Sequence, residues 1–278
     1  MSAVPSAWNP CATCGECCRN YIVSVCGYDV WQICARERLS PERFLIVCPQ
    51  DEPRRDSFFL QHGGQAYGLM LDKKGPLKAK RPCVFLMQLG GGHDRCGIYD
   101  HRPVVCQAYP MGLTQGDVTR REGVLCPADA WTAGEVRRPA WRRALQRQRL
   151  CFDVYRQVVL RWNARVSHHP GARFAIPEYF TYLLNVYDGL ARLDGDVGPD
   201  AMSRVEASWG VWPDAARAAA ATGALSTPPL RIESAPWLSY LHRVKEILDR
   251  FYPGVAPQPL TLPAPSDDES RAPQAMSA

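Results

Sequence analysis

The sequence lacks the features of a membrane, secreted or disordered protein. None of its 278 residues lies in an apolar run of the roughly 18 residues that a membrane span needs. The segment Met1–Pro10 has neither a basic start nor an apolar stretch, so we expect no secretory signal. Hydrophobic residues make up 46% and charged residues 22%, which suits a chain with a packed core. We therefore expect a folded cytoplasmic protein with no membrane segment.

Two common cofactor signatures are also missing. The CxxxCxxC spacing of radical S-adenosylmethionine enzymes does not occur, and no glycine-rich strand–turn–helix segment suits a dinucleotide-type fold. The glycines of Leu89–His93 read as a loose loop between two cysteine segments. The sequence therefore does not identify an enzyme. Two enzyme classes stay open, an iron-dependent oxidoreductase and a methyltransferase-like enzyme.

Cysteine is the residue in excess. The chain has 12 cysteines, and all but Cys151 lie between Cys11 and Cys126. Disulfide scaffolds are typical of short secreted chains, whereas this chain is long, apolar enough to fold and without an export signal. The cysteines therefore favour metal ligation in a reducing compartment, with the chemistry in the first half of the chain.

The first cysteine cluster is compact. It reads Cys11-Ala-Thr-Cys14-Gly-Glu-Cys17-Cys18, and its two-residue spacers allow successive thiolates to turn toward one metal. Gly15 suits a chain that wraps around a metal, because such turns often need a positive φ. Adjacent side chains such as those of Cys17 and Cys18 tend to diverge. This pair therefore favours a polynuclear centre or two neighbouring sites.

The second group of cysteines is spread along the chain, at Cys83, Cys96, Cys106 and Cys126. Pro103 predicts a helix start that would place Cys106 in the first turn, where free N–H groups stabilise a thiolate. The apolar neighbours that would form a dry shell around a metal are Phe85, Leu86, Ile98 and Tyr99.

Together these motifs resemble the YkgJ-type cysteine-cluster family, a zinc- or iron-chelating CxxCxxCC domain that is distantly similar to flagellin lysine methylases. The resemblance rests on the CxxCxxCC run, on Cys83-Val-Phe-Leu and on the segment from Cys96-Gly-Ile-Tyr to Cys106-Gln-Ala-Tyr-Pro, and it covers about residues 11–130. The metal ligands that it implies are Cys11, Cys14, Cys17, Cys18, Cys83, Cys96, Cys106 and Cys126. The chain departs from the family at Cys126-Pro127-Ala128, where the family has Cys-Pro-Gly.

Other residues near the motifs are weaker candidates for a role at the metal site. The cysteines that stand singly among apolar residues are expected to fill the core: Cys26, Cys34, Cys48 and Cys151. His93 and His101 lie between candidate ligands, and either complete a metal site or stay solvated in loops. The polar groups expected around the ligands, where they would orient them, are Tyr99, Asp100, Arg102 and Tyr109.

Thiolate-rich sites select zinc and iron–sulfur clusters over hard cations. Eight thiolates can hold two tetrahedral zinc ions, an iron–sulfur cluster plus zinc, or one larger iron centre. We interpret the protein as one that binds iron, as an iron–sulfur or iron centre, or zinc, and that could support redox or group-transfer chemistry. The alternative is a structural zinc module that presents a helical or Arg-rich surface to a protein or nucleic-acid partner.

The Arg-rich segment carries the nucleic-acid hypothesis. Residues 120–165 contain 11 arginines and four acidic residues. Such a stripe binds phosphate, but arginines are also ordinary solvated residues that cover apolar surface. Because these arginines wrap several faces of the expected helix, we favour the second role. The sequence names neither a substrate nor a protein partner.

The predicted fold class is mainly α, with an irregular, metal-organised N-terminal half that has a few short strands and an all-helical C-terminal half. We divide the chain into a flexible N-terminus (1–10), a cysteine-cluster domain (11–135), a helical domain (136–252) and a disordered tail (253–278). Helices are predicted over 29–39, 41–47, 139–168, 176–194, 213–221 and 236–252, and extended pieces over 58–60, 66–71 and 83–86.

Overall fold

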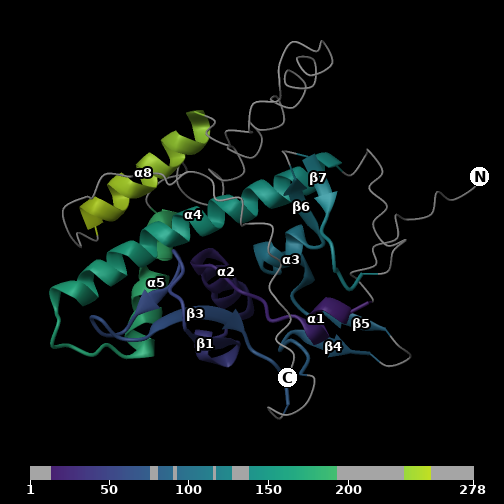
Figure 1. Cartoon of the computed structure of the whole chain (residues 1–278), viewed down its shortest axis with the longest axis horizontal. Helices are drawn as coiled ribbons and strands as arrows, with labels where there is room; N and C mark the ends of the chain where they lie inside the picture. The colour runs from purple at the N-terminus through teal and green to yellow at the C-terminus, as the bar shows by residue number, and fades with distance from the viewer. Residues whose placement is uncertain are drawn as a thin grey trace, which may run out of the picture.

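The computed structural model describes residues 14–75, 81–89, 93–114, 117–126, 138–192 and 235–251. Within these ranges the chain forms six α-helices and seven β-strands, and all seven strands belong to the N-terminal half (Figure 1). The prediction of a mainly α fold is therefore wrong, because three small antiparallel sheets organise the N-terminal half. The described part of the C-terminal half is helical.

The largest sheet has the strand order β1-β3-β2. It consists of β1 (Leu45–Gln50), β2 (Phe58–Phe59) and β3 (Ala66–Leu71), with Leu45 opposite Leu71. The sequence predicted a helix up to about Val47, but only a short 3-10 turn forms, η2 (Pro41–Arg43), and β1 follows it. Proline is tolerated within β1 because β1 is an edge strand.

Short elements surround this sheet, and they carry five of the 12 cysteines: Cys17, Cys18, Cys34, Cys96 and Cys106. The helices are α1 (Glu16–Asn20), α2 (Gly27–Glu37) and α3 (Val104–Ala108), with a 3-10 turn, η3 (Tyr99–His101), before α3. The hairpins pair β4 (Leu86–Gln88) with β5 (Asp94–Cys96), and β6 (Met111–Thr114) with β7 (Asp117–Arg120).

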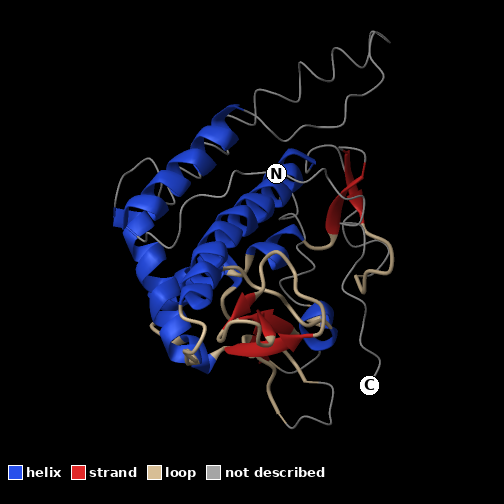
Figure 2. Ribbon diagram, turned by 60° about the vertical axis from the view of Figure 1, so that its left-hand side comes forward, coloured by secondary structure: helices blue, strands red, loops and turns tan. Residues whose placement is uncertain are grey.

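The C-terminal half contains α4 (Arg138–His168), α5 (Ile176–Arg192) and α8 (Ala235–Phe251), close to the predicted ranges. Figure 1 shows α8 lying along α4, and Arg161 of α4 pairs with Asp249 of α8 at 2.5 Å. Figure 2 shows the long helices gathered on one side of the strands. The predicted helix at 213–221 and the terminal segments 1–10 and 253–278 lie outside the described residues.

Helix α4 is tied directly to the sheet. Asn163 accepts a hydrogen bond from the Phe59 N–H at 3.0 Å and donates one to the Ser57 carbonyl at 2.9 Å. Phe58 stacks on Tyr179 of α5 at 3.8 Å between ring centroids. One continuous apolar core thus includes residues of both halves. The predicted boundary at 135/136 lies outside the described residues and stays a prediction.

None of the described helices combines the length and the apolar character that a membrane crossing requires.

Candidate metal centre

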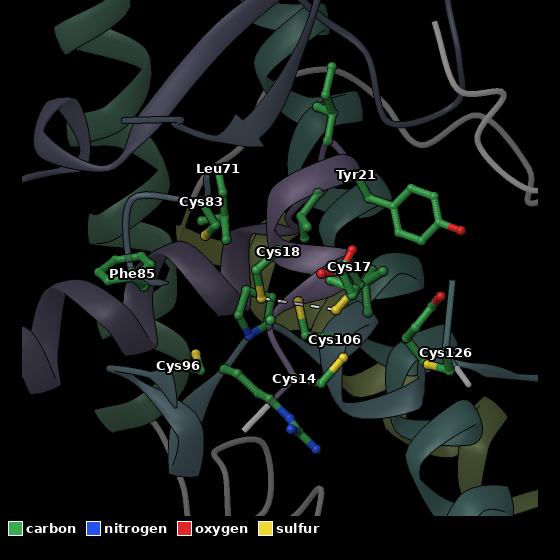
Figure 3. A pocket seen from close by; sticks show the side chains of 18 of the residues that line it. Cys14, Cys17, Cys18, Tyr21, Leu71, Cys83, Phe85, Cys96, Cys106 and Cys126 are labelled. Atoms are coloured by element: carbon green, nitrogen blue, oxygen red, sulfur yellow. Dashed lines mark hydrogen bonds between the residues drawn. The ribbon is translucent and has the colours of Figure 1, made fainter. Parts of the chain in front are cut away.

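Seven cysteines line one cavity of about 140 Å³, and they come from segments far apart in the sequence (Figure 3). They are Cys14, Cys17, Cys18, Cys83, Cys96, Cys106 and Cys126. The structure therefore brings together every predicted ligand that it describes; Cys11 lies outside the described residues. Apolar side chains complete much of the wall, among them Val23, Leu71, Phe85 and Ile98.

Gly15 begins the segment that presents Cys17 and Cys18. It caps α1 with φ 67°, in the left-handed region that the sequence predicted. A Cβ at Gly15 would lie 2.8 Å from the Asp94 Cβ and 3.2 Å from the Leu86 Cδ1. Glycine is therefore needed both for the turn and for the close approach of the β4–β5 hairpin.

The carbonyl of Cys18 joins α1 to the next cysteine segment. It accepts hydrogen bonds from the Cys83 N–H at 2.7 Å and from the Lys73 Nζ at 2.9 Å. Cys96 ends β5, opposite Leu86 of β4. Backbone pairing thus sets the positions of Cys18, Cys83 and Cys96 relative to one another.

Helix α3 presents Cys106 in its first turn, as Pro103 predicted, with Pro103 itself as the N-cap. The Val104 N–H at the start of this helix donates to the Asp29 Oδ1 at 2.9 Å. Val104 is fully buried. A buried carboxylate on α2 therefore holds the helix that carries Cys106.

Two tyrosines hold the segment that ends at Cys126. Tyr21 Oη donates to the Gly123 carbonyl at 3.2 Å, and Tyr109 Oη accepts from the Leu125 N–H at 3.0 Å. The two rings meet edge to face, with centroids 5.5 Å apart. Cys126 therefore has a defined place at the cavity wall.

The adjacent thiols of Cys17 and Cys18 do not diverge. Their Sγ atoms lie 4.0 Å apart, near the separation of about 3.8 Å between two thiolates of one tetrahedral ion with metal–sulfur bonds of about 2.3 Å. The prediction that these neighbours point apart is therefore wrong, because α1 turns both side chains toward the same cavity. Adjacency alone thus no longer argues for a polynuclear centre.

The thiols share the cavity without yet forming a complete ligand set. Across the described ranges, no three or more His, Cys, Asp or Glu side chains are already placed to hold one ion. The donor set nevertheless suits soft metals such as zinc and iron, because sulfur dominates it.

Burial and charge act on these thiols in opposite directions. The hydrogen bond from Cys17 lowers the pKa of Cys18 to about 7, helped by the charges of Lys73, Arg102 and Arg19 and opposed by burial. Burial raises the pKa of Cys83 to about 11, and it also raises the pKa values of Cys96 and Cys106. A metal cation reverses this effect because it stabilises coordinating thiolates directly. Three of the four thiols thus favour the neutral form until a metal binds.

The three cations near Cys18 differ in their other contacts. Arg19 donates to the Cys14 carbonyl at 3.2 Å and pairs with Glu16 and Asp94. Lys73 donates to the Cys18 carbonyl at 2.9 Å. Arg102 lines the cavity, and its guanidinium lies 4.3 Å from the centroid of the Tyr99 ring. Arg102 therefore has the position at the cavity that its motif predicted, whereas Arg19 and Lys73 carried no sequence signal.

The two candidate histidines and the four single cysteines lie away from the cavity. His101 pairs with Glu37 at 2.5 Å, and His93 is exposed. Cys26 and Cys151 are buried in the core, while Cys34 and Cys48 are half-buried. Among the described residues, no histidine lines the cavity.

Comparison with known families supports this site. Residues 10–127 match a family model described as a "putative zinc- or iron-chelating domain". This segment is therefore similar to the CxxCxxCC family. The match contains all eight predicted ligands, from Cys11 to Cys126. Searches of curated proteins and of solved structures found no match to the chain. The finer resemblance to YkgJ-type proteins and flagellin lysine methylases stays a prediction.

Proposed function

We propose that the CxxCxxCC domain binds iron, as an iron–sulfur or iron centre, through the thiols of the cavity together with Cys11. The observation that carries this proposal is the number of thiols: seven line one cavity, whereas one tetrahedral ion needs four. The excess favours a polynuclear centre. Thiolates also hold iron–sulfur clusters in preference to hard cations.

The volume of the cavity gives further support. A site for one water needs about 10–15 Å³ of such volume, so a cavity of about 140 Å³ has room for several atoms beyond a single ion. Bound iron would supply one-electron chemistry. Much of the wall is apolar, and Arg102 and Lys73 balance part of the thiolate charge. A redox or group-transfer role in the cytoplasm, on a substrate not yet identified, is the activity that such a centre would support.

A structural zinc site is the second candidate. The 4.0 Å between the Cys17 and Cys18 sulfurs suits two ligands of one zinc ion. A structural zinc contributes on the order of 10 kcal/mol to folding, which suits a half built from strands of two to six residues. In this role the domain would present the helices, or their arginines, to a protein or nucleic-acid partner.

The metal content and the absorption spectrum of anaerobically purified protein separate the two candidates. Iron with inorganic sulfide, and a broad band near about 400 nm, would support the iron–sulfur centre. Two zinc ions per chain and no visible absorption would support the structural role. A protein purified with neither metal, and unable to take up either, would contradict both.

Serine variants test the ligand set. Cys17→Ser and Cys106→Ser should lose most of the bound metal, because serine is a poor ligand for soft metals. Cys151→Ser and Cys34→Ser are the matched controls, since neither side chain lines the cavity, and both should keep the metal content of the unaltered protein. Loss of metal from Cys151→Ser alone would contradict the assignment.

A further inference from the structure

Asp29 is a buried carboxylate that joins the starts of two helices. It is 1% exposed and lies in the first turn of α2. Its Oδ2 accepts from the Cys26 N–H at 3.1 Å and from the Cys26 thiol at 3.3 Å. Its Oδ1 accepts from the Val104 N–H at 2.9 Å, 75 residues further along the chain. One oxygen thus caps its own helix and the other caps α3.

The contact with α3 does more than satisfy a helix end. The first N–H groups of a helix have no partner within the helix, and α3 has only five residues, so few internal bonds hold it in place. Its N-cap, Pro103, makes no side-chain hydrogen bond to it. Val104 is fully buried, so water does not replace the contact. The direction of the first turn of α3 therefore depends on Asp29.

Cys106 follows Val104 by two residues, in that same first turn, and its side chain lines the cavity. We propose that Asp29 is a positioning residue for the metal centre, which holds the Cys106 thiol at the cavity by anchoring the N-terminus of α3. This role rests on the proposed metal-binding function. Asp29 itself touches no cysteine of the cavity, and it acts only through the backbone of Val104.

A purely structural cap of α2 predicts a different behaviour. Loss of such a cap would loosen α2 and expose the cavity cysteines together. Loss of an anchor of α3 would expose Cys106 more than Cys83 or Cys96, which backbone pairing holds independently. Reactivity of the individual thiols therefore distinguishes the two roles.

The test is alkylation of the full-length protein, as purified, with iodoacetamide, followed by peptide mass spectrometry. In Asp29→Ala the rate of alkylation at Cys106 should rise about ten-fold or more, on the scale of the metal affinity that is lost when a group orienting a ligand is removed. The rates at Cys83 and Cys96 should change less than about two-fold. The control is Asp188→Ala, which removes the 2.8 Å hydrogen bond from Trp31 and so loosens α2 on α5 without touching α3. Asp188→Ala should leave the rate of alkylation at Cys106 unchanged.

Asp29→Asn serves if Asp29→Ala does not fold, because an amide keeps one acceptor oxygen, and its rate at Cys106 should be intermediate. An equal rise at all three thiols, or no rise at Cys106, would overturn the positioning role. The outcome is independent of the metal assignment: a protein that holds no metal would contradict the proposed function, yet the alkylation pattern would still decide whether Asp29 positions Cys106.

Discussion

Gly15 is the residue on which the entry into α1 depends. Its positive φ and the nearby Asp94 Cβ impose two separate demands, one on the backbone and one on the space beside it. Gly63 shares the first demand, with φ 65°, but a Cβ there would meet nothing within 4 Å. The two glycines therefore separate the cost of backbone strain from the cost of crowding at the cysteine cluster.

We expect Gly15→Ala to lower the free energy of unfolding by about 2–4 kcal/mol, because left-handed backbone strain and overpacking add. Gly63→Ala should cost only about 1–2 kcal/mol. Denaturation by guanidinium chloride measures both. Equal decreases in the free energy of unfolding of the two variants would show that the β4–β5 hairpin shifts to make room for a methyl group at position 15.

At the residue scale, the sequence predicted which cysteines meet but not how they meet. The spacing of Cys14, Cys17 and Cys18 placed them at one site because the motif is local. The close approach of the Cys17 and Cys18 sulfurs depends on the turn of α1, which the spacing does not determine. His101 was a candidate ligand only because it stands between two cysteines in sequence. Its pairing with Glu37 joins segments distant in the chain, which no local pattern reveals.

At the scale of secondary-structure elements, the burial of Asp29 between α2 and α3 makes the stability of the fold depend on pH. Burial raises the pKa of Asp29 to about 6, against the hydrogen bonds from Val104 and Cys26 and the charge of Arg147. A raised pKa means that the folded protein binds this proton more tightly than the unfolded chain does. Protonation of Asp29 therefore adds to the free energy of unfolding as the pH falls through about 6 toward 4. This contribution is lost again as the pH rises through about 6.

We expect the free energy of unfolding to increase, relative to that of Asp29→Asn, by on the order of 2 kcal/mol between pH 7 and pH 4. Comparison of the two proteins by chemical denaturation at several pH values measures this difference and cancels the groups that they share. Among its neighbours, Cys26 and Tyr28 also have raised pKa values, so they stay neutral in this range. If the difference in the free energy of unfolding between the two proteins stayed constant with pH, Asp29 would not titrate between pH 7 and pH 4.

Helices were predicted more closely than strands. Helix α4 spans 31 residues, long enough for its apolar periodicity to be unambiguous. Strand β1 has six residues, and so short an apolar run suits a buried helix as well as a strand. Only its pairing with β3 decides the matter, and that pairing joins Leu45 to Leu71. The hairpin of β6 and β7 was missed because each strand has only four residues, and neither forms an apolar run.

At the scale of the whole molecule, the main observation is the shared core. Buried residues such as Phe58 and Val104 of the cysteine half belong to the same apolar cluster as Trp162, Leu183 and Leu248 of the helices. Units that share a core lose much of their stability when they separate, because the apolar surface between them becomes exposed. The two halves should therefore unfold together.

We expect one unfolding transition, with the same midpoint by far-UV circular dichroism, which reports the helices, and by tryptophan fluorescence. Removal of the metal with EDTA should lower the midpoint of this transition as a whole, because a ligand bound only to the folded state stabilises it. Two separate transitions would instead indicate that the two predicted domains, residues 11–135 and 136–252, fold independently.

The order of the cysteines along the chain has a consequence for how the protein is made. Cys83 follows Cys18 by 65 residues. At about 5–20 residues per second, a ribosome needs about 3–13 s to add the chain between them. During that interval the nascent chain contains only four of the eight predicted ligands, Cys11, Cys14, Cys17 and Cys18, which are enough for one tetrahedral ion. The metal found in a purified sample should therefore depend on which ions the cell supplies during translation, so cultures fed with iron and with zinc should yield different occupancies.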